Sequence, residues 1–357
     1  MNRYSDSPMP LVGRTPGRGV NRALGAALAA VVTLAGVQAM AAELNLYTSR
    51  HYQTDEALYS DFTDATGIKV NRIEGKAGAL FERLKSEGAN SPADVMLTVD
   101  AGMLWRMDQA GLFAPVESSE LDAKVPANLR HPDGHWFGFS TRARVIYVAN
   151  GKVGDGEIKS YEDLADAKWK GRICIRSSSN IYNQSLLSSL IAANGEKGAE
   201  DWANAVVGNM ARDPQGGDTD QIRAVAAGEC DVAVGNSYYY LRLVKSDKPE
   251  DKAVVEKVSL IFPNQDGRGA HVNISGGAML KNAPNKDSAV KFLEYLASES
   301  AQRYFADGNN EFPVVAGVKG NDVVQGLGDF KIDPINVAVY GENQPSAQKV
   351  FDRAGWK

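Results

Sequence analysis

Residues 44–99 read LNLYTSRHYQTDEALYSDFTDATGIKVNRIEGKAGALFERLKSEGANSPADVMLTV, and this stretch decides the fold. Short apolar runs with strand character alternate here with amphipathic segments of helical period. The expected elements are strand 44–47, helix 55–65, strand 68–73, helix 77–87 and strand 94–99. Gly67 and Gly88 stop the two helices, as glycine commonly does. This β-α-β-α-β order predicts a parallel sheet with helices on its faces.

The same alternation returns further along the chain. The expected elements there are strand 172–175, helices from about Asn180, from Glu200 and over 221–228, strand 231–234 and a helix from Ser237. Residues 144–148 are expected to cross between the two units, and the glycine-rich stretch 261–280 to carry the chain back. Two α/β lobes joined in this way place a ligand between them, outside the carboxyl ends of the strands.

Length and composition indicate a globular protein of two domains. The chain has 357 residues, more than one core usually supports. Its 43% hydrophobic and 23% charged residues are ordinary for a folded protein. The formal net charge of −5 argues against a general nucleic-acid binder, which normally has a basic face. Two cysteines are too few for a disulfide scaffold or for a cysteine-based zinc or iron–sulfur site.

Residues 1–41 have the organisation of a secretory signal peptide. Four arginines precede the uncharged apolar run 23–37, which is shorter than the roughly twenty residues that span a bilayer. Ala39-Met40-Ala41 then supplies the small-x-small pattern of a cleavage site. We therefore expect residues 1–41 to be removed and the protein to work in a bacterial periplasm.

Tyrosines occupy three places where a predicted strand gives way to a helix. Tyr52 follows the first strand, Tyr182 follows the Ser-Ser-Ser-Asn run at 177–180, and Tyr238–Tyr240 follow strand 231–234. A helix N-terminus carries unsatisfied N–H groups and about half a positive charge, so it favours an ionised phenol. Phenolates are hard oxygen ligands that suit Fe³⁺, and four of them around that ion would carry a net charge of −1.

The residues alone leave two points open. Any single tyrosine is explained more simply as an amphipathic core or rim residue with a polar tip. Two of Tyr238, Tyr239 and Tyr240 are expected to face the site. Adjacent residues on a regular helix point apart, so a chelating pair requires the irregular first turn. The pattern does not choose which two.

Seven short segments share the pattern of a known family. They are Tyr47–Tyr52 (YTSRHY), Glu74–Lys76 (EGK), Ser91–Val95 (SPADV), Gly138–Val145 (GFSTRARV), Arg176–Asn183 (RSSSNIYN), Asn236–Tyr239 (NSYY) and Phe262–Gln265 (FPNQ). Together they resemble the periplasmic ferric-iron-binding proteins of ABC transporters, within the extracellular solute-binding proteins. The resemblance extends from about Leu44 to Gly317, and its SRHY and NSYY segments are the most specific.

The resemblance implies a hinged, two-lobed Venus-flytrap fold that closes on Fe³⁺ and passes it to a membrane permease driven by an ATPase. The implied iron ligands are Tyr52 of the N-terminal lobe and Tyr182, Tyr238 and Tyr239 of the C-terminal lobe. His51 matches a position that is a fifth ligand in some members and a supporting group in others. Tyr240 lies outside the matched pair and is expected to be structural. Arg142 and Arg176 match basic positions whose charge offsets the phenolates and orients them.

The expected boundaries follow from this architecture. Residues 42–141 and 268–320 form the N-terminal lobe, 142–267 form the C-terminal lobe, and 321–357 pack on the lobes. Each lobe is expected to be a mainly parallel sheet flanked by helices, with hinge strands between the lobes. We expect a monomer.

Cys174 and Cys230 lie at the starts of two strands predicted in one sheet of the C-terminal lobe. A disulfide is geometrically reasonable if those strands are neighbours. Two buried free thiols are the alternative.

Histidine offers little support for another metal site. His131 and His135 are four residues apart, but Pro132-Asp133-Gly134 between them breaks any helix, so the usual chelating face is lost. A zinc site there is therefore disfavoured. His271 is a lone histidine in a strand-like run and is expected to be a hydrogen-bonded structural residue.

An enzyme is also disfavoured, and no catalytic residue or resident cofactor is predicted. The chain contains no G-x-S-x-G elbow, H-E-x-x-H motif or Walker loop. The nearer alternative is a protein of the same fold that binds a small anion or a polyamine, because fold does not fix the ligand. A basic site with the tyrosines turned away would favour an anion, and an acidic aromatic box would favour a polyamine.

Overall fold

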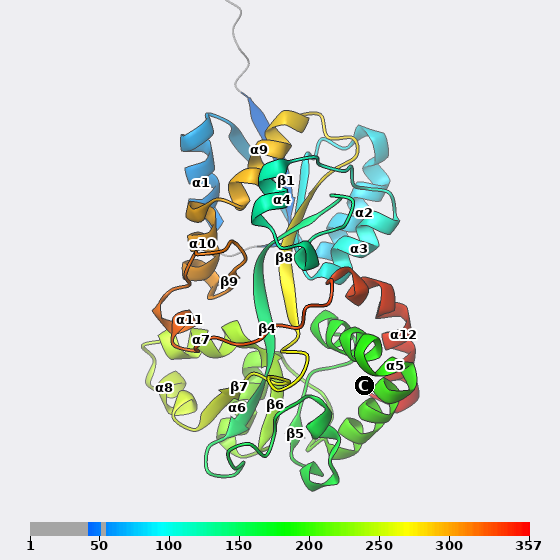
Figure 1. The fold of residues 1–357 in the computed structure, drawn as a ribbon, viewed down its shortest axis with the longest axis vertical. Helices are drawn as coiled ribbons and strands as arrows, with labels where there is room; N and C mark the ends of the chain where they lie inside the picture. The colour runs from blue at the N-terminus through cyan, green and yellow to red at the C-terminus, as the bar shows by residue number, and fades with distance from the viewer. Residues whose placement is uncertain (1–41, 51–54) are drawn as a thin grey trace, which may run out of the picture. The chain divides into compact units, whose positions relative to one another are not determined.

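The strands join into one sheet that is parallel toward its ends and antiparallel at its centre (Figure 1). The computed structural model describes residues 42–50 and 55–357. In these residues the strand order is β2-β1-β3-β8-β4-β6-β5, and β7 and β9 both pair with β4. The strands are β1 (Glu43–Thr48), β2 (Lys69–Glu74), β3 (Val95–Val99), β4 (Phe137–Ala149), β5 (Ile173–Cys174), β6 (Val232–Asn236), β7 (Val258–Ile261), β8 (Val272–Met279) and β9 (Phe312–Pro313).

The parallel pairs are those that the alternation predicted. β1 pairs in parallel with β2 and β3, and β5 pairs in parallel with β6. The two central strands, β4 and β8, run antiparallel to each other, and β4 also runs antiparallel to β6. All 13 residues of β4 are buried, so this one strand belongs to the core along its whole length. The expected crossing segment 144–148 is the second half of β4.

β8 carries the chain back beside β4, and a glycine makes that packing possible. A Cβ atom on Gly276 would lie 2.7 Å from the Leu104 side chain and 2.7 Å from the Phe137 carbonyl oxygen. No larger residue fits so close an approach. The glycine-rich stretch therefore ends in a buried strand rather than in a loop.

Helices cover the sheet on both faces (Figure 1). They are α1 (Asp55–Thr66), α2 (Ala77–Glu87), α3 (Ala101–Gln109), α4 (Ser119–Lys124), α5 (Ile181–Asn209), α6 (Asp218–Ala227), α7 (Ser237–Lys245), α8 (Pro249–Val255), α9 (Lys286–Leu296), α10 (Glu299–Asn309), α11 (Asp322–Gln325) and α12 (Ala338–Ala354). α5 contains a break at Gly195, where φ is 72°. The second of the two expected helices thus begins at about Gly195, five residues earlier than predicted. Glycine is the residue type that adopts this φ most readily.

The last helix, α12, packs against both α5 and α3. Gly341 of α12 lies against Trp105 of α3, where a Cβ atom would come within 2.3 Å of the tryptophan Cβ. Residues 41–357 form a single compact unit by their contacts, and the lobe boundaries stay predictions. Among the described residues, no helix combines the length and apolar character needed to cross a bilayer.

Asp100 ties three elements together at the start of α3. Its backbone has a φ of 85°, which is unusual for a residue with a side chain. The buried carboxylate accepts hydrogen bonds from Gly102 N–H (2.8 Å), from the Ser185 hydroxyl of α5 (2.9 Å) and from the Asn273 amide of β8 (2.9 Å). One side chain therefore caps α3 and holds it to α5 and to the central strand β8.

Asp100→Asn should change how stability depends on pH. Burial raises the pKa of Asp100 to about 6, above the value of about 3.9 expected in the unfolded chain. The folded state therefore holds the proton more tightly, and this stabilisation is present below about pH 4 and is lost as the pH rises through about 6. The wild-type free energy of unfolding should fall by about 2–3 kcal/mol relative to the variant between about pH 4 and pH 7.

Urea unfolding at a series of pH values measures this difference. Asp266→Asn, at an exposed carboxylate, is the matched control and should follow the wild type. Parallel pH profiles for wild type and Asp100→Asn would contradict the assigned burial effect.

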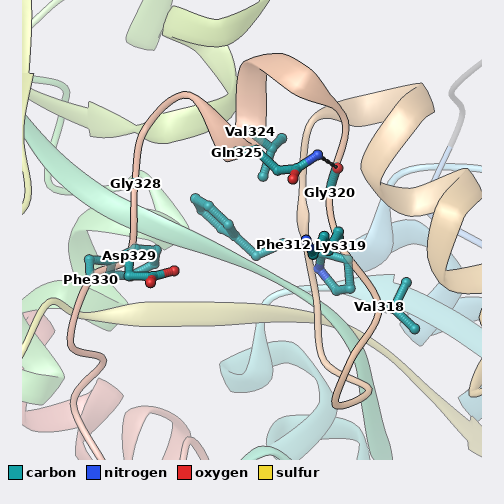
Figure 2. A pocket seen from close by; sticks show the side chains of 10 residues that line it. Phe312, Val318, Lys319, Gly320, Val324, Gln325, Gly328, Asp329 and Phe330 are labelled. Carbon is teal, nitrogen blue, oxygen red and sulfur yellow. Dashed lines mark hydrogen bonds between the residues drawn. The ribbon is translucent and has the colours of Figure 1, made fainter.

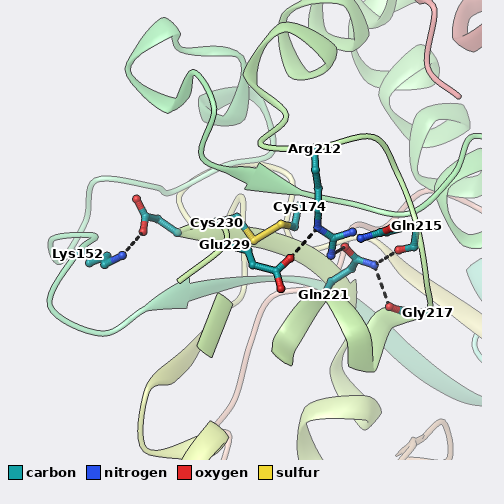
Figure 3. Close-up of a disulfide and its surroundings, with 9 residues drawn as sticks. Lys152, Cys174, Arg212, Gln215, Gly217, Gln221, Glu229 and Cys230 are labelled. Atoms are coloured by element: carbon teal, nitrogen blue, oxygen red, sulfur yellow. Dashed lines mark hydrogen bonds and ion pairs between the residues drawn. A yellow bond between two sulfur atoms is a disulfide. The ribbon is translucent and has the colours of Figure 1, made fainter. Parts of the chain in front are cut away.

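Cys174 and Cys230 form a disulfide, with Cα atoms 5.9 Å apart (Figure 3). Cys174 lies in β5, and Cys230 precedes β6, which is the parallel neighbour of β5. The strand neighbourhood on which the predicted pairing depended is therefore present. Both cysteines are buried, and the Arg212–Glu229 ion pair (3.1 Å) lies beside them.

Removing the disulfide with Cys174→Ser/Cys230→Ser should lower the free energy of unfolding by about 2–4 kcal/mol, because the bond restricts the unfolded chain. Urea unfolding of the oxidised protein measures this, and reduction of the wild type should reproduce the shift. An unchanged urea midpoint would show that the bond does not stabilise the fold.

Candidate metal centre

Two strand-to-helix junctions present the tyrosines of the predicted C-terminal set. α5 begins just after Asn180, whose side-chain oxygen accepts a hydrogen bond from Tyr182 N–H (3.2 Å). α7 begins at Ser237, directly where β6 ends, so Tyr238 and Tyr239 stand in its first turn. All three tyrosines therefore lie where helix N–H groups are unsatisfied and the helix dipole is positive.

The structure brings Tyr182 and Tyr238 into direct contact. The Tyr238 hydroxyl donates to the Tyr182 hydroxyl oxygen at 3.4 Å. The ring of Tyr239 lies on that of Tyr238, with centroids 4.3 Å apart. Tyr240 is different, because its hydroxyl donates to the Val258 carbonyl oxygen at 3.0 Å. The hydroxyl of Tyr240 thus bonds to the backbone, whereas that of Tyr238 contacts Tyr182. Tyr238 and Tyr239 therefore remain the better candidates for a shared site.

Arginines surround the tyrosine rings. The guanidinium carbons of Arg144 and Arg176 lie 5.8 and 5.6 Å from the centre of the Tyr182 ring. Arg242 lies 5.0 Å from the Tyr238 ring and 5.4 Å from that of Tyr239. The tyrosine cluster, which consists of Tyr182, Tyr238 and Tyr239, therefore has basic rather than acidic side chains around its rings, and these stabilise phenolates.

Arg142 is buried next to the cluster, and its charge acts on Tyr182 and Tyr238. Burial lowers the pKa of Arg142. The charges of Glu311 and the two tyrosines raise it by more, so the pKa of Arg142 lies above its ordinary value. Its Nη1 donates to the Ser275 hydroxyl at 3.1 Å. Its Nη2 is buried without a hydrogen-bond partner among the described residues. Arg142 and Arg176, both named from the sequence, thus lie near Tyr182.

A fully buried carboxylate, Asp218 of α6, holds the arginines in place. It accepts from Arg144 Nη1 (2.8 Å) and pairs with Arg176 Nη1 (3.3 Å). It also accepts from the backbone N–H of Asn236 (2.8 Å), the last residue of β6. Arg144 Nη2 in turn donates to the Asn183 side chain (2.6 Å) in the first turn of α5. Asp218 therefore fixes the two tyrosine-bearing junctions relative to each other.

Sequence reasoning missed Asp218, Arg144 and Arg242. Arg144 lies two residues from Arg142 on a strand, so the two share one face of it, and this spacing could have identified it. Arg242 is four residues after Tyr238 on a helix, which also places the two on one face. Asp218 had no local signal, because its partners lie on three other elements.

The phenol of Tyr182 is hard to ionise in the metal-free protein. Burial raises its pKa, the neighbouring Tyr239 raises it further, and Arg142 opposes both. The hydroxyl is therefore protonated at neutral pH. Only a cation that binds oxygen strongly would displace that proton.

His51 and Tyr52 lie outside the described residues, so their predicted roles stay predictions. The described residues on either side of them, Arg50 and Asp55, form a buried ion pair with an Nε–Oδ2 distance of 3.1 Å. Arg50 also pairs with buried Glu311 at 3.0 Å. The two ends of the intervening segment are therefore tied to each other and to the core.

A pocket of about 670 Å³ lies between β9 and α11 (Figure 2). Its ten lining residues include the rings of Phe312 and Phe330 and the charged side chains Lys319 and Asp329. None of the ten is a tyrosine or an arginine, but α11 packs on α7, and Phe312 pairs with Thr141, the residue before Arg142.

Comparison with known proteins identifies the family. A family model described as bacterial extracellular solute-binding protein matches residues 90–327. The chain belongs to this family. The chain is also similar to Iron uptake protein A2 of Synechocystis, with 55% identity over 316 residues that cover 88% of this chain and 90% of the relative.

Solved structures of such solute-binding proteins superimpose on this one. FutA of Trichodesmium, in complex with iron and citrate, has 60% identity and a TM-score of 0.86, covering 88% of this chain and 100% of its own. A ferric binding protein from Campylobacter jejuni has 43% identity and a TM-score of 0.82, again covering 88% and 100%. The family resemblance and the two-lobed α/β fold expected from the sequence are thereby confirmed. These relatives are solute-binding and uptake proteins rather than enzymes.

Asp218→Asn should destabilise the protein strongly, because it removes the buried charge that compensates Arg144 and Arg176. We expect the free energy of unfolding to fall by about 3–5 kcal/mol. Asp220→Asn, on the same helix, removes one charge but keeps a side-chain oxygen that can accept from Gly217 N–H, so it should cost less than about 1 kcal/mol. Urea unfolding of both variants measures this, and equal losses would contradict the role assigned to Asp218.

Proposed function

We propose that this protein is a periplasmic receptor that captures Fe³⁺ through tyrosinate ligands and delivers it to an ABC permease. The observation that carries the proposal is the 3.4 Å contact between the hydroxyls of Tyr182 and Tyr238, at the starts of two helices. Two phenol oxygens this close need only lose their protons to bind one oxygen-seeking ion.

The ligand set consists of Tyr182, Tyr238 and Tyr239, with Tyr52 as the fourth phenolate from the other lobe. His51 remains a candidate fifth ligand. Fe³⁺ is a hard cation and favours such oxygen donors over sulfur. Four phenolates around Fe³⁺ leave a net charge of −1. Arg142, Arg176 and Arg144 supply positive charge beside the tyrosines, which offsets it.

The relatives support the same ligand and setting. Their names describe iron uptake and ferric binding, and one was solved with iron and citrate. We infer export by the signal peptide at 1–41, release into the periplasm, and action as a monomer with a permease and its ATPase as partners. No catalytic step is part of the proposal.

A small anion is the alternative that a specific observation favours. The buried Nη2 of Arg142 lacks a hydrogen-bond partner in the described part of the chain. The contact between the hydroxyls of Tyr182 and Tyr238 argues against an anion as the sole ligand, because binding an anion does not require two phenols in contact. The arginines around the rings disfavour a polyamine, because like charges repel.

The tyrosine assignment predicts a coloured complex. Purified protein with Fe³⁺ should turn orange-red, because phenolate-to-iron charge transfer absorbs visible light. Tyr238→Phe/Tyr239→Phe should abolish both the colour and tight ferric binding, since two charged oxygen ligands are lost. Absorption spectroscopy during a ferric titration in the presence of a competing chelator measures both.

Tyr240→Phe is the matched control, because its hydroxyl is bonded to Val258 rather than to the cluster. It should keep the colour and the affinity. A colourless wild type, or equal loss in Tyr240→Phe, would contradict the assignment.

A further inference from the structure

Residues 131–135 form a tight turn that places two histidines side by side. His131 N–H donates to the Trp136 carbonyl oxygen (2.9 Å), and Gly134 N–H donates to the His131 carbonyl oxygen (3.1 Å). Gly134 has a φ of 72°, the left-handed conformation that such a turn requires. The rings of His131 and His135 lie parallel, with centroids 4.6 Å apart. The Pro-Asp-Gly sequence that excludes a helix thus brings the two rings together by another route.

A carboxylate from a distant part of the chain completes the group. Asp108, near the end of α3, places Oδ1 2.6 Å from His135 Nδ1 and Oδ2 3.4 Å from His131 Nε2. The three ligand atoms all lie within 4.8 Å of one another. The Asp108 side chain is only 7% exposed, whereas His131 and His135 are 17% and 30% exposed, so the group is ordered by packing yet reachable from solvent.

We propose that Asp108, His131 and His135 form a site for a divalent transition metal ion of the zinc type, separate from the tyrosine cluster. Two imidazole nitrogens and one carboxylate oxygen are the donor set that such ions take in proteins. Mg²⁺ and Ca²⁺ would demand oxygen ligands instead. Three protein ligands leave a further position for water, as in an open zinc site.

The hydrogen bonds of the turn define which nitrogen of His131 carries the ring hydrogen. His131 Nδ1 accepts a hydrogen bond from Asp133 N–H (3.1 Å), which leaves the ring hydrogen on Nε2, facing Asp108. An ion would displace that hydrogen.

Binding requires changes in both hydrogens and distances. The ring hydrogen of His131 must move to Nδ1, which opens the bond from Asp133 N–H. His135 must carry its hydrogen on Nε2, so that Nδ1, which now faces Asp108 at 2.6 Å, is free to bind. The ligand atoms must also lie about 3.3 Å from one another around a tetrahedral ion with bonds of about 2.0–2.1 Å. His135 Nδ1 and Asp108 Oδ1, now 2.6 Å apart, must therefore separate slightly. Because these changes cost free energy, we expect a dissociation constant in the micromolar range. The bound metal would link α3 to the turn that precedes β4.

Titration with Zn²⁺ tests the proposal. The protein should be free of affinity tags, stripped with a chelator, and carry Tyr238→Phe/Tyr239→Phe so that those phenols cannot compete. Calorimetry should show one equivalent of Zn²⁺ bound. Adding His131→Gln/His135→Gln or Asp108→Asn should weaken this binding at least tenfold, whereas Asp133→Asn, which keeps its backbone N–H, should not.

Cobalt substitution supplies a second measurement. Co²⁺ should give the visible bands of a four-coordinate site, and the histidine variant should lose them. Zn²⁺ should also raise the melting temperature of the parent protein by a few degrees, but not that of the histidine variant. If Zn²⁺ binds the histidine variant or Asp108→Asn with unchanged affinity, or does not bind the parent protein at millimolar concentration, the proposal is wrong.

This test is independent of the ferric proposal. His131→Gln/His135→Gln with the natural tyrosines should retain the ferric colour if that proposal holds, and circular dichroism shows that the variant is folded. Asp108→Asn decides the question if the double histidine variant fails to fold.

Discussion

The ion pairs of one buried carboxylate organise the tyrosine cluster. Asp218 has no solvent to stabilise its charge, so it must be compensated by the groups around it. Those groups are Arg144, Arg176 and the backbone N–H that ends β6. Because Arg144 also bonds Asn183 in the first turn of α5, the carboxylate links both helices that carry the tyrosines. The position of the phenols therefore depends on the balance of charge between Asp218 and the two arginines.

The same charge balance bears on the ionisation of the phenols. Two neutral hydroxyls share a hydrogen bond across 3.4 Å, and the arginines that face their rings carry the charge that phenolates would need. Ionisation in the absence of a metal is resisted by burial. The cluster is thus poised to exchange protons for a cation. The site at Asp108 has different chemistry, because its imidazole nitrogens suit softer divalent ions.

Much of the fold follows from local patterns in the sequence. α2 and α7 begin where they were expected, because the hydrophobic period changes at each start. The strand ends drew attention to Tyr182 and to the run 238–240, and the resemblance in the NSYY segment selected Tyr238 and Tyr239 from that run. The antiparallel centre of the sheet was less predictable, since pairing of β4 with β8 depends on residues more than a hundred positions apart.

What the sequence could not predict are contacts between separate elements. Asp218 looks like any acidic residue at a helix start, and only the fold places it against two arginines. His131 and His135 were judged by helical spacing alone, whereas a turn brings their rings together and α3 supplies Asp108. In both cases the partner residues are distant in the sequence, so no local hydrophobic pattern indicates the contact.

The central claim is that the hydroxyl oxygens of Tyr182 and Tyr238 share one ferric ion. Anomalous diffraction at the iron edge, from crystals of the iron-loaded protein, tests it most directly. The account predicts one strong iron peak within bonding distance of both oxygens. An iron peak that lies away from the two tyrosines, with their hydroxyls still hydrogen-bonded to each other, would contradict it.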